Sequence, residues 1–305
     1  MSYAVLFPGQ GSQHVDMLPW LEDEAPAAPV LQAMAALLGT DWRQRLGDAD
    51  FLSRNQVAQV LVTGVSLAAW AAVSAGLPTP PEIVAGYSVG ELAAVACAGV
   101  FDAPTALALA MQRARAMDAA VQGLETGLLS VSGLNQAARD DILGTLRVEP
   151  AIRIAPDHLI LAGEDATLQT AERLLTEGGA HCKRLPIRVA SHSSWMRPAA
   201  AAFAQSLAGI GWRPLRSAVA ANATGSALRR PEPLRDALSR QIDHTVCWDV
   251  CLEAVAERRV ERVIEIGPGR ALSSLWARRY PDVPVRALED FRSAHSAAEW
   301  LSQLD

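Results

Sequence analysis

The sequence has few of the residues that mark nucleic-acid-binding or disordered proteins. Lysine occurs once, at Lys183, among 27 basic residues that face 33 acidic ones, so the 305-residue chain carries a formal net charge of −6. General nucleic-acid binding usually needs a basic face, and this balance argues against it. Only 20% of the residues are charged and 50% are hydrophobic, a composition that excludes intrinsic disorder.

Cysteine is also scarce, and its spacing does not suggest a metal site. The four cysteines are Cys97, Cys182, Cys247 and Cys251, and none forms a C-x-x-C pair. The last two lie four residues apart, but no partner pair of histidines or cysteines has the spacing of a zinc site. We therefore expect free thiols and no metal.

Charge is absent from one long stretch, residues 55–81, which raises the question of a membrane span. Several glycine, serine and proline residues interrupt the stretch, and no basic cluster flanks it. The pattern predicts a helix buried on several sides of a large core. The first residues lack the basic segment of a signal peptide. We expect a soluble, cytoplasmic protein without a membrane partner.

Short apolar runs alternate with helical segments along most of the chain. Strands are expected at 4–7, 82–86, 217–221 and 263–266, and helices at 25–38, 54–76, 89–98, 104–120, 195–210, 234–241 and 249–258. This alternation predicts an α/β fold with a mostly parallel sheet and helices on both faces.

The segment 125–189 has a different order. Strands are expected at 128–132, 151–155, 159–162 and 182–189, with helices at 136–146 and 166–177. The order β-α-β-β-α-β is that of a ferredoxin-like unit. The chain is therefore predicted to form a core from residues 1–124 and 190–305, interrupted by a ferredoxin-like subdomain at 125–189.

The most specific local motif is G-x-S-x-G, at residues 86–90, with Ser88 at its centre. It follows an expected strand and opens an expected helix, which is the context of a nucleophile elbow. The two glycines permit a sharp turn, and the helix N-terminus favours developing negative charge. Ser88 is the candidate nucleophile.

A serine nucleophile needs a base. Among six histidines, His192 stands at the end of an expected strand, where a base in an α/β fold is expected, and His244 is a weaker competitor. No acid stands out as the group that orients His192. Glu265, Asp243, Asp249 and a backbone carbonyl all remain open.

The turn Gly9-Gln10-Gly11-Ser12 follows the first expected strand. It is similar to the start of a dinucleotide fingerprint, but position 14 is His14 instead of the third glycine, and no ribose-binding acid lies at the usual distance. The turn is instead suited to contribute a backbone N–H to an oxyanion hole, with the N–H of Val89 as the second donor.

Five motifs in order make the chain similar to a known family. They are Phe7-Pro8-Gly9-Gln10-Gly11-Ser12-Gln13, Gly86-Tyr87-Ser88-Val89-Gly90-Glu91, Gln112-Arg113, Ser191-His192 and Glu265-Ile266-Gly267-Pro268-Gly269. Together they resemble the malonyl-CoA:acyl-carrier-protein transacylases and the acyltransferase domains of polyketide synthases. The resemblance implies an α/β-hydrolase-like core with an inserted ferredoxin-like subdomain, in agreement with the pattern of strands and helices.

The resemblance also assigns roles to site residues. It implies that Ser88 is the nucleophile, that His192 is the general base, and that the backbone N–H groups of Gln10 and Val89 form the oxyanion hole. The reaction is then transfer of a malonyl group from malonyl-CoA to the phosphopantetheine thiol of an acyl carrier protein, with no bound cofactor.

Two further roles follow from the same resemblance. Arg113 is expected to hold the free carboxylate of the malonyl group, because a guanidinium binds a planar carboxylate through two parallel hydrogen bonds. The family orients its histidine with a main-chain carbonyl, and the matching residue here is Cys247.

Two departures from the family pattern bear on the substrate. Tyr87 stands where fatty-acid transacylases usually have His, which makes the chain look like the epsilon subunit of malonate decarboxylase, with other subunits of that enzyme as partners. Trp195 is bulkier than expected beside the pocket and leaves acyl-chain selectivity open. The alternatives are a stand-alone transacylase of fatty-acid or polyketide synthesis, a non-catalytic docking subunit, and an ester hydrolase.

Overall fold

The main sheet of the computed structural model carries the elements that position the candidate site. The structure describes residues 2–133 and 136–303. The strands in spatial order are β11 (Val285–Ala287), β10 (Arg262–Glu265), β1 (Tyr3–Phe7), β2 (Ile83–Gly86), β7 (Ala218–Ala220) and β8 (Ala227–Leu228). The first five run parallel, and β8 pairs antiparallel with β7. The expected mostly parallel sheet is confirmed.

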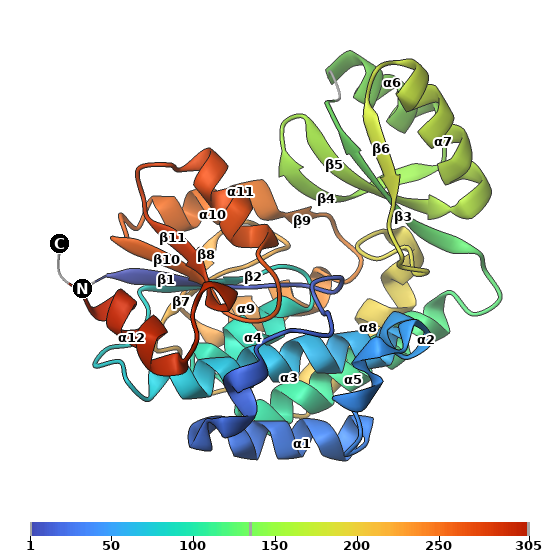
Figure 1. Cartoon of the computed structure of the whole chain (residues 1–305). Helices are drawn as coiled ribbons and strands as arrows, with labels where there is room; N and C mark the ends of the chain where they lie inside the picture. Colours follow the sequence, from blue (N-terminus) through green and yellow to red (C-terminus); the bar gives the residue numbers. More distant parts are fainter. Residues whose placement is uncertain (1, 134–135, 304–305) are drawn as a thin grey trace.

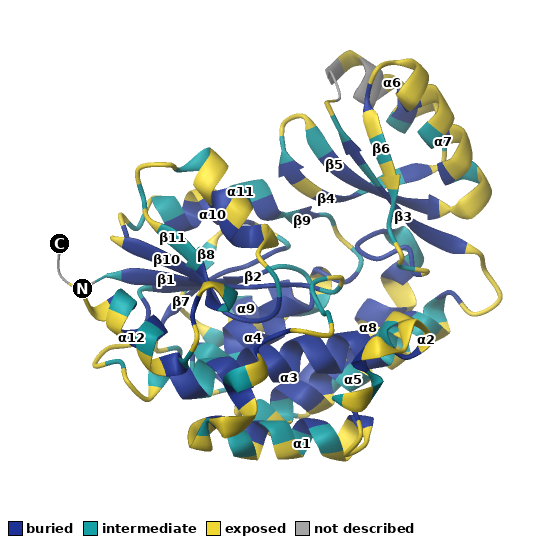
Figure 2. Cartoon of the chain, in the orientation of Figure 1, coloured by how far each residue is buried: buried dark blue, intermediate teal, exposed yellow. Residues whose placement is uncertain are grey.

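Alternating residues of the central strand β1, dark blue in Figure 1, face two separate cores, and Figure 2 colours most of this strand as buried. Tyr3, Val5 and Phe7 pack into one cluster, and Ala4 and Leu6 into the other. This period-2 alternation of buried residues is typical of a sheet covered on both faces.

Helices cover both faces of the sheet. The cluster around Val5 receives α1 (Ala28–Leu38), α3 (Asn55–Ser74), α4 (Gly90–Cys97), α5 (Ala103–Ala120), α8 (Arg197–Ala208), α9 (Pro231–Arg240) and α12 (Ala294–Ser302). The opposite cluster receives α10 (Trp248–Ala256) and α11 (Ala271–Arg279). The short helix α2 (Ala49–Ser53) precedes α3.

Helix α3 contains most of the uncharged stretch seen in the sequence. It is long and apolar enough to cross a membrane by length and composition, but 83% of its most apolar window is buried inside the fold. It packs against α1, α4, α5 and α12. These neighbours account for its apolar composition, as predicted for a core helix.

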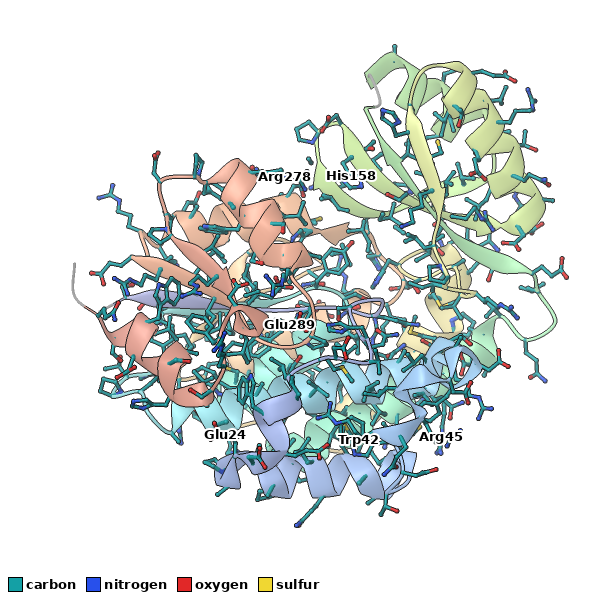
Figure 3. The ribbon with its side chains drawn as sticks, in the orientation of Figure 1. Glu24, Trp42, Arg45, His158, Arg278 and Glu289 are labelled. Atoms are coloured by element: carbon teal, nitrogen blue, oxygen red, sulfur yellow. The ribbon has the colours of Figure 1, made fainter. Side chains whose placement is uncertain are left out.

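A second sheet forms the other lobe in Figure 1, and Figure 3 shows both lobes with their side chains in the same orientation. Its order is β6 (His181–Arg184), β3 (Thr126–Ser132), β5 (His158–Glu164), β4 (Val148–Ala155) and β9 (Val246–Cys247). The first four strands pair antiparallel, and α6 (Gln136–Thr145) and α7 (Asp165–Glu177) complete the order β-α-β-β-α-β. This is the expected ferredoxin-like subdomain. The residue ranges of the two parts stay a prediction, and β9 joins this sheet from outside the range 125–189.

Two expectations about local structure were wrong. The strand expected over 182–189 ends at Arg184, because Pro186 has no N–H to continue the ladder. The segment from 186 to 192 instead leaves the sheet and leads into the core. The sequence pattern also missed the helices α2, α11 and α12 and the strands β8, β9 and β11. These strands are only two or three residues long.

Candidate active site

Ser88 lies on a strained turn between β2 and α4. Its φ is +55°, a left-handed conformation that is uncommon for a residue other than glycine. A Cβ at Gly86 would lie 2.1 Å from the carbonyl oxygen of Gly90, and one at Gly90 would lie 2.4 Å from the carbonyl oxygen of Phe7. Both glycines are therefore required by close backbone contact. The turn leaves Ser88 half-buried at the carboxyl end of the sheet.

His192 and Ser88 meet although 104 positions separate them in the chain. The distance from Ser88 Oγ to His192 Nε2 is 2.7 Å. The backbone N–H of His192 donates to the carbonyl of Ile242 at 2.9 Å, and Nδ1 lies 2.5 Å from the carbonyl oxygen of Gln241. A carbonyl only accepts, so Nδ1 carries the proton and Nε2 presents its lone pair to the serine hydroxyl.

The carbonyl that orients His192 belongs to Gln241, so the assignment to Cys247 was wrong. Gln241 directly follows α9, where helix carbonyls lack intrahelical partners and are free to accept. Cys247 lies in β9 beside Arg153, and its N–H donates to the carbonyl of Asn222 at 2.8 Å.

The acids considered for this role are engaged elsewhere. Asp243 contacts the neighbouring His244, Asp249 faces Arg153, and Glu265 accepts from backbone N–H groups at the start of α11. The backbone-carbonyl alternative is thus the one that the structure places beside the histidine.

The surroundings of His192 favour the neutral imidazole. The side chain is 2% exposed. Burial and the nearby charge of Arg113 lower the pKa of His192 to about 3, and the hydrogen bond to Gln241 acts in the opposite direction. At neutral pH the imidazole is uncharged and able to take a proton from Ser88.

Arg113 places a buried positive charge next to the nucleophile. It comes from α5 and is 2% exposed. Its Nη1 donates to Gln59 Oε1 at 2.7 Å, and its Nη2 to Gln241 Oε1 at 2.9 Å and to Ser88 Oγ at 3.4 Å. Burial lowers the pKa of Arg113 to about 10, against the opposing effect of Glu91, so the guanidinium stays charged at neutral pH.

Sequence reasoning missed two residues that hold this site together, Asn222 and Gln241. Asn222 accepts from the N–H of Ser88 at 2.9 Å and donates to the carbonyl of Gly86 at 2.7 Å. The amide of Gln241 donates to the carbonyl of Ser88 at 2.9 Å and to Glu91 at 3.0 Å. Asn222 follows β7, the strand beside β2, and its place after a parallel strand is a signal that could have identified it.

Glu91 is a buried carboxyl in the same network. It is fully buried in the first turn of α4 and accepts from the N–H of Asn222 at 2.9 Å. Burial raises the pKa of Glu91 to about 8, while hydrogen bonds from Asn222 and Gln241 and the charge of Arg113 act in the opposite direction. The carboxyl thus binds Asn222 and Gln241, the two residues whose side chains bond to the backbone of the Ser88 turn.

The loop with Gln10 packs against the turn that holds Ser88. A Cβ at Gly9 would lie 2.6 Å from the carbonyl oxygen of Tyr87, and the N–H of Tyr87 donates to the carbonyl of Phe7 at 2.9 Å. Within residues 2–133 and 136–303, the backbone N–H groups of Gln10 and Val89 have no acceptor. Both are available at the carboxyl ends of two adjacent strands.

A cavity of about 360 Å³ opens beside Gln10, between α2 and the segment that leads to His192; its lining includes Arg54, Asp118 and Arg188. Trp195 lies three residues after His192 and packs half-buried against both cores of the sheet. In the part of the chain that the structure describes, no group of three histidine, cysteine or acidic side chains is arranged to hold a metal.

Comparisons with known proteins agree with this fold and geometry. A model of the acyl transferase domain family matches residues 5–289. The chain is 31% identical over 296 residues to the malonyl CoA-acyl carrier protein transacylase of Salmonella typhimurium, covering 94% of this chain and 96% of that protein. It is 32% identical over 294 residues to the transacylase of the same name from Mycobacterium bovis, with the same coverage.

Solved structures agree closely as well. The acyl-carrier-protein S-malonyltransferase of Burkholderia pseudomallei superposes with a TM-score of 0.89 at 32% identity, covering 98% of this chain and all of that one. A malonyl-transacylase solved in complex with a type II polyketide synthase acyl-carrier protein gives a TM-score of 0.90 at 29% identity, with 98% and 99% coverage. The chain therefore belongs to the acyl transferase domain family, alongside the malonyl CoA-acyl carrier protein transacylases.

Proposed function

We propose that the protein transfers a malonyl group from malonyl-CoA to the phosphopantetheine thiol of an acyl carrier protein through a malonyl-Ser88 intermediate. One observation carries this proposal. A neutral His192 lies 2.7 Å from Ser88 Oγ, and Nη2 of the buried Arg113 lies 3.4 Å from the same oxygen. A nucleophile with its base beside a buried guanidinium suits an acyl group that ends in a free carboxylate.

The first half-reaction loads Ser88. As the serine oxygen attacks the thioester carbonyl, its proton moves to Nε2 of His192, and negative charge develops on the carbonyl oxygen. The N–H groups of Gln10 and Val89 are assigned to hold this oxyanion. The C–S bond then breaks, and the coenzyme A sulfur leaves with the proton from Nε2, which yields malonyl-Ser88 and neutral His192.

The second half-reaction unloads the enzyme along the reverse path. The phosphopantetheine thiol gives its proton to Nε2 of His192 and attacks the malonyl ester. Collapse of the tetrahedral intermediate breaks the C–O bond, and the proton returns to Ser88. The carboxylate of the acyl group rests on Arg113 throughout, and the chemistry uses no bound cofactor.

Two versions of this function differ in the carrier protein that accepts the malonyl group. The similarity to malonyl CoA-acyl carrier protein transacylases favours a carrier of fatty-acid or polyketide synthesis. Tyr87, which packs edge-on against Trp248 with ring centroids 5.2 Å apart, is the feature that supports a role as the epsilon subunit of malonate decarboxylase. We favour the first version. In either one we expect the protein to act in the cytoplasm.

Mass spectrometry and a comparison of carriers test the proposal. After mixing with malonyl-CoA, the intact protein is expected to gain one malonyl group on Ser88, and adding an accepting carrier should discharge it. Acyl carrier proteins of fatty-acid synthesis, polyketide synthesis and malonate decarboxylase are then compared in the discharge step. A chain that stays unmodified contradicts the proposed mechanism, and discharge only to the malonate decarboxylase carrier reverses our preference between the two versions.

The lowered pKa of His192 predicts an unusual pH profile. The base is active when neutral, and its folded-state pKa of about 3 keeps it neutral far below the ordinary value of 6.5. We expect kcat/KM for loading of Ser88 to stay flat from about pH 7 to about pH 5. Single-turnover loading across this range measures it, with circular dichroism at each pH to verify folding. An acid limb near pH 6.5 would contradict the buried, neutral histidine.

A further inference from the structure

A row of polar side chains connects Arg113 to the surface between α3 and α5. Asn55 Nδ2 donates to Asp118 Oδ1 at 2.9 Å, and Gln59 Nε2 donates to Asn55 Oδ1 at 2.8 Å. The row ends where Arg113 Nη1 donates to Gln59 Oε1 at 2.7 Å. We call Asp118, Asn55 and Gln59 the amide relay. Its inner member Gln59 is 1% exposed, and Asp118 lines the cavity beside Gln10.

Each member of the amide relay fixes the orientation of the next. An ionised carboxylate only accepts, so Asp118 holds the NH₂ group of Asn55, which also donates to the carbonyl of Ala114 at 3.3 Å. The oxygen of Asn55 is thereby turned towards Gln59 and accepts from its NH₂ group. Only the oxygen of Gln59 is then left to face Arg113. Reversing any of these amides would place two donors against each other.

The relay offers Arg113 a neutral acceptor instead of a negative one. Both side-chain amides bonded to the guanidinium, from Gln59 and Gln241, accept without cancelling its charge. The oxygens of Glu91 are occupied by the Asn222 N–H and the Gln241 amide. The Nε of Arg113 is buried with no hydrogen-bond partner among the described residues. The guanidinium is thus held in place by neutral acceptors and forms no ion pair with a carboxylate among residues 2–133 and 136–303.

We propose that the amide relay is a positioning device that sets the preference of the enzyme for acyl groups with a free carboxylate. It aims Arg113 at the acyl group on Ser88, and the neutral side chain at position 59 leaves the guanidinium charge for the substrate. The inference rests on the proposed malonyl transfer and adds that Gln59, Asn55 and Asp118 determine specificity without touching the reacting atoms.

The test compares loading of Ser88 from malonyl-CoA and from acetyl-CoA in full-length variants. Gln59→Glu places a carboxylate against Arg113, which competes with the malonyl carboxylate, and we expect kcat/KM for malonyl-CoA to fall about 30-fold. The acetyl group has no carboxylate that binds Arg113, so kcat/KM for acetyl-CoA is expected to change less than about threefold. Gln59→Met removes the acceptor without adding charge. The ratio of kcat/KM for malonyl-CoA to kcat/KM for acetyl-CoA, the malonyl-to-acetyl ratio, should then fall about fivefold.

The outer end of the relay has its own variant and a matched control. Asp118→Asn lets position 118 present a donor to Asn55, so the amide orientations are no longer enforced, and the ratio is expected to fall about threefold. Asp50→Asn removes the same charge from the lining of the same cavity outside the relay and should leave the ratio unchanged.

The outcomes separate this inference from the proposed function. If the unmodified protein does not form malonyl-Ser88, the proposed function itself is contradicted. If that protein loads normally, equal losses for both thioesters in Gln59→Glu, or an unchanged ratio in Gln59→Met, overturn the role of the relay. Should Gln59→Glu fail to fold in circular dichroism, the ratio in Gln59→Met decides alone. An equal fall in ratio for Asp50→Asn and Asp118→Asn would reduce the effect to general cavity charge.

Discussion

Replacing Ser88 with alanine is expected to abolish malonyl-group transfer, with kcat/KM at least roughly 10³-fold below that of the unmodified protein. The reason is structural as well as chemical. The hydroxyl is the group that the turn between β2 and α4 presents to His192, and alanine keeps the backbone while removing the atom that forms the acyl bond. His192→Ala is expected to cause a comparable loss, because the serine alone is a weak nucleophile.

The double variant distinguishes a cooperating pair from two independent contributions. Residues that act as a unit show grossly non-additive effects, so Ser88→Ala combined with His192→Ala should be about as inactive as either alone. Intact-protein mass spectrometry should detect no acyl adduct in any of the three. Ser206→Ala, on α8 and away from the site, is the matched control and should load normally. An adduct that persists in Ser88→Ala would identify a different nucleophile.

The second large effect is expected from Arg113→Ala, which should lower kcat/KM for malonyl-CoA about 100-fold and change that for acetyl-CoA far less. A charge-assisted pair between guanidinium and carboxylate in a buried site contributes about 2–3 kcal/mol, and each 1.4 kcal/mol is a factor of ten. Arg113→Lys is not expected to restore the rate, because Nη1 and Nη2 bond to separate partners, Gln59 and Gln241.

Arg113→Ala is also expected to change the pKa of His192, the proposed base. The charge of Arg113 is one of the causes that lower the pKa of His192, so its removal should raise that pKa and move the acid limb of kcat/KM to higher pH. Loading is measured with both thioesters over pH, and thermal unfolding verifies that each variant is folded. Arg115→Ala, an exposed neighbour on the same helix, is the control. Equal losses with malonyl-CoA and acetyl-CoA would remove the carboxylate-binding role.

Local patterns were sufficient to predict the parts of the site that depend on local geometry. The G-x-S-x-G motif identifies Ser88 as the candidate nucleophile because the backbone contacts at Gly86 and Gly90 exclude any side chain there. The two glycines that this geometry requires are visible in the sequence. The order of strands and helices between 125 and 189 predicted a ferredoxin-like unit, because each element there is long enough to show its own period.

The contacts that hold the candidate catalytic groups in place could not be predicted from local sequence patterns. Gln241 was expected only as the end of a helix, and nothing in its sequence neighbourhood shows that its carbonyl accepts from His192 while its amide contacts Ser88 and Arg113. The assignment to Cys247 was wrong because carbonyls are identical along the chain, and their use depends on which one the fold brings within reach.

The sequence by itself determined the class of fold, the nucleophile candidate and the low content of charge that places α3 in the core. The tertiary structure alone decided which carbonyl orients His192 and which amides hold Arg113. The physical reason is the range of the interactions involved. Turns, caps and strand periods are recorded in neighbouring residues, whereas the contacts of Gln241 with Ser88 and of Arg113 with Gln59 join positions 153 and 54 apart. The scarcity of lysine and the net charge excluded whole classes of protein, and one buried arginine, placed by packing between helices, carries the proposed specificity.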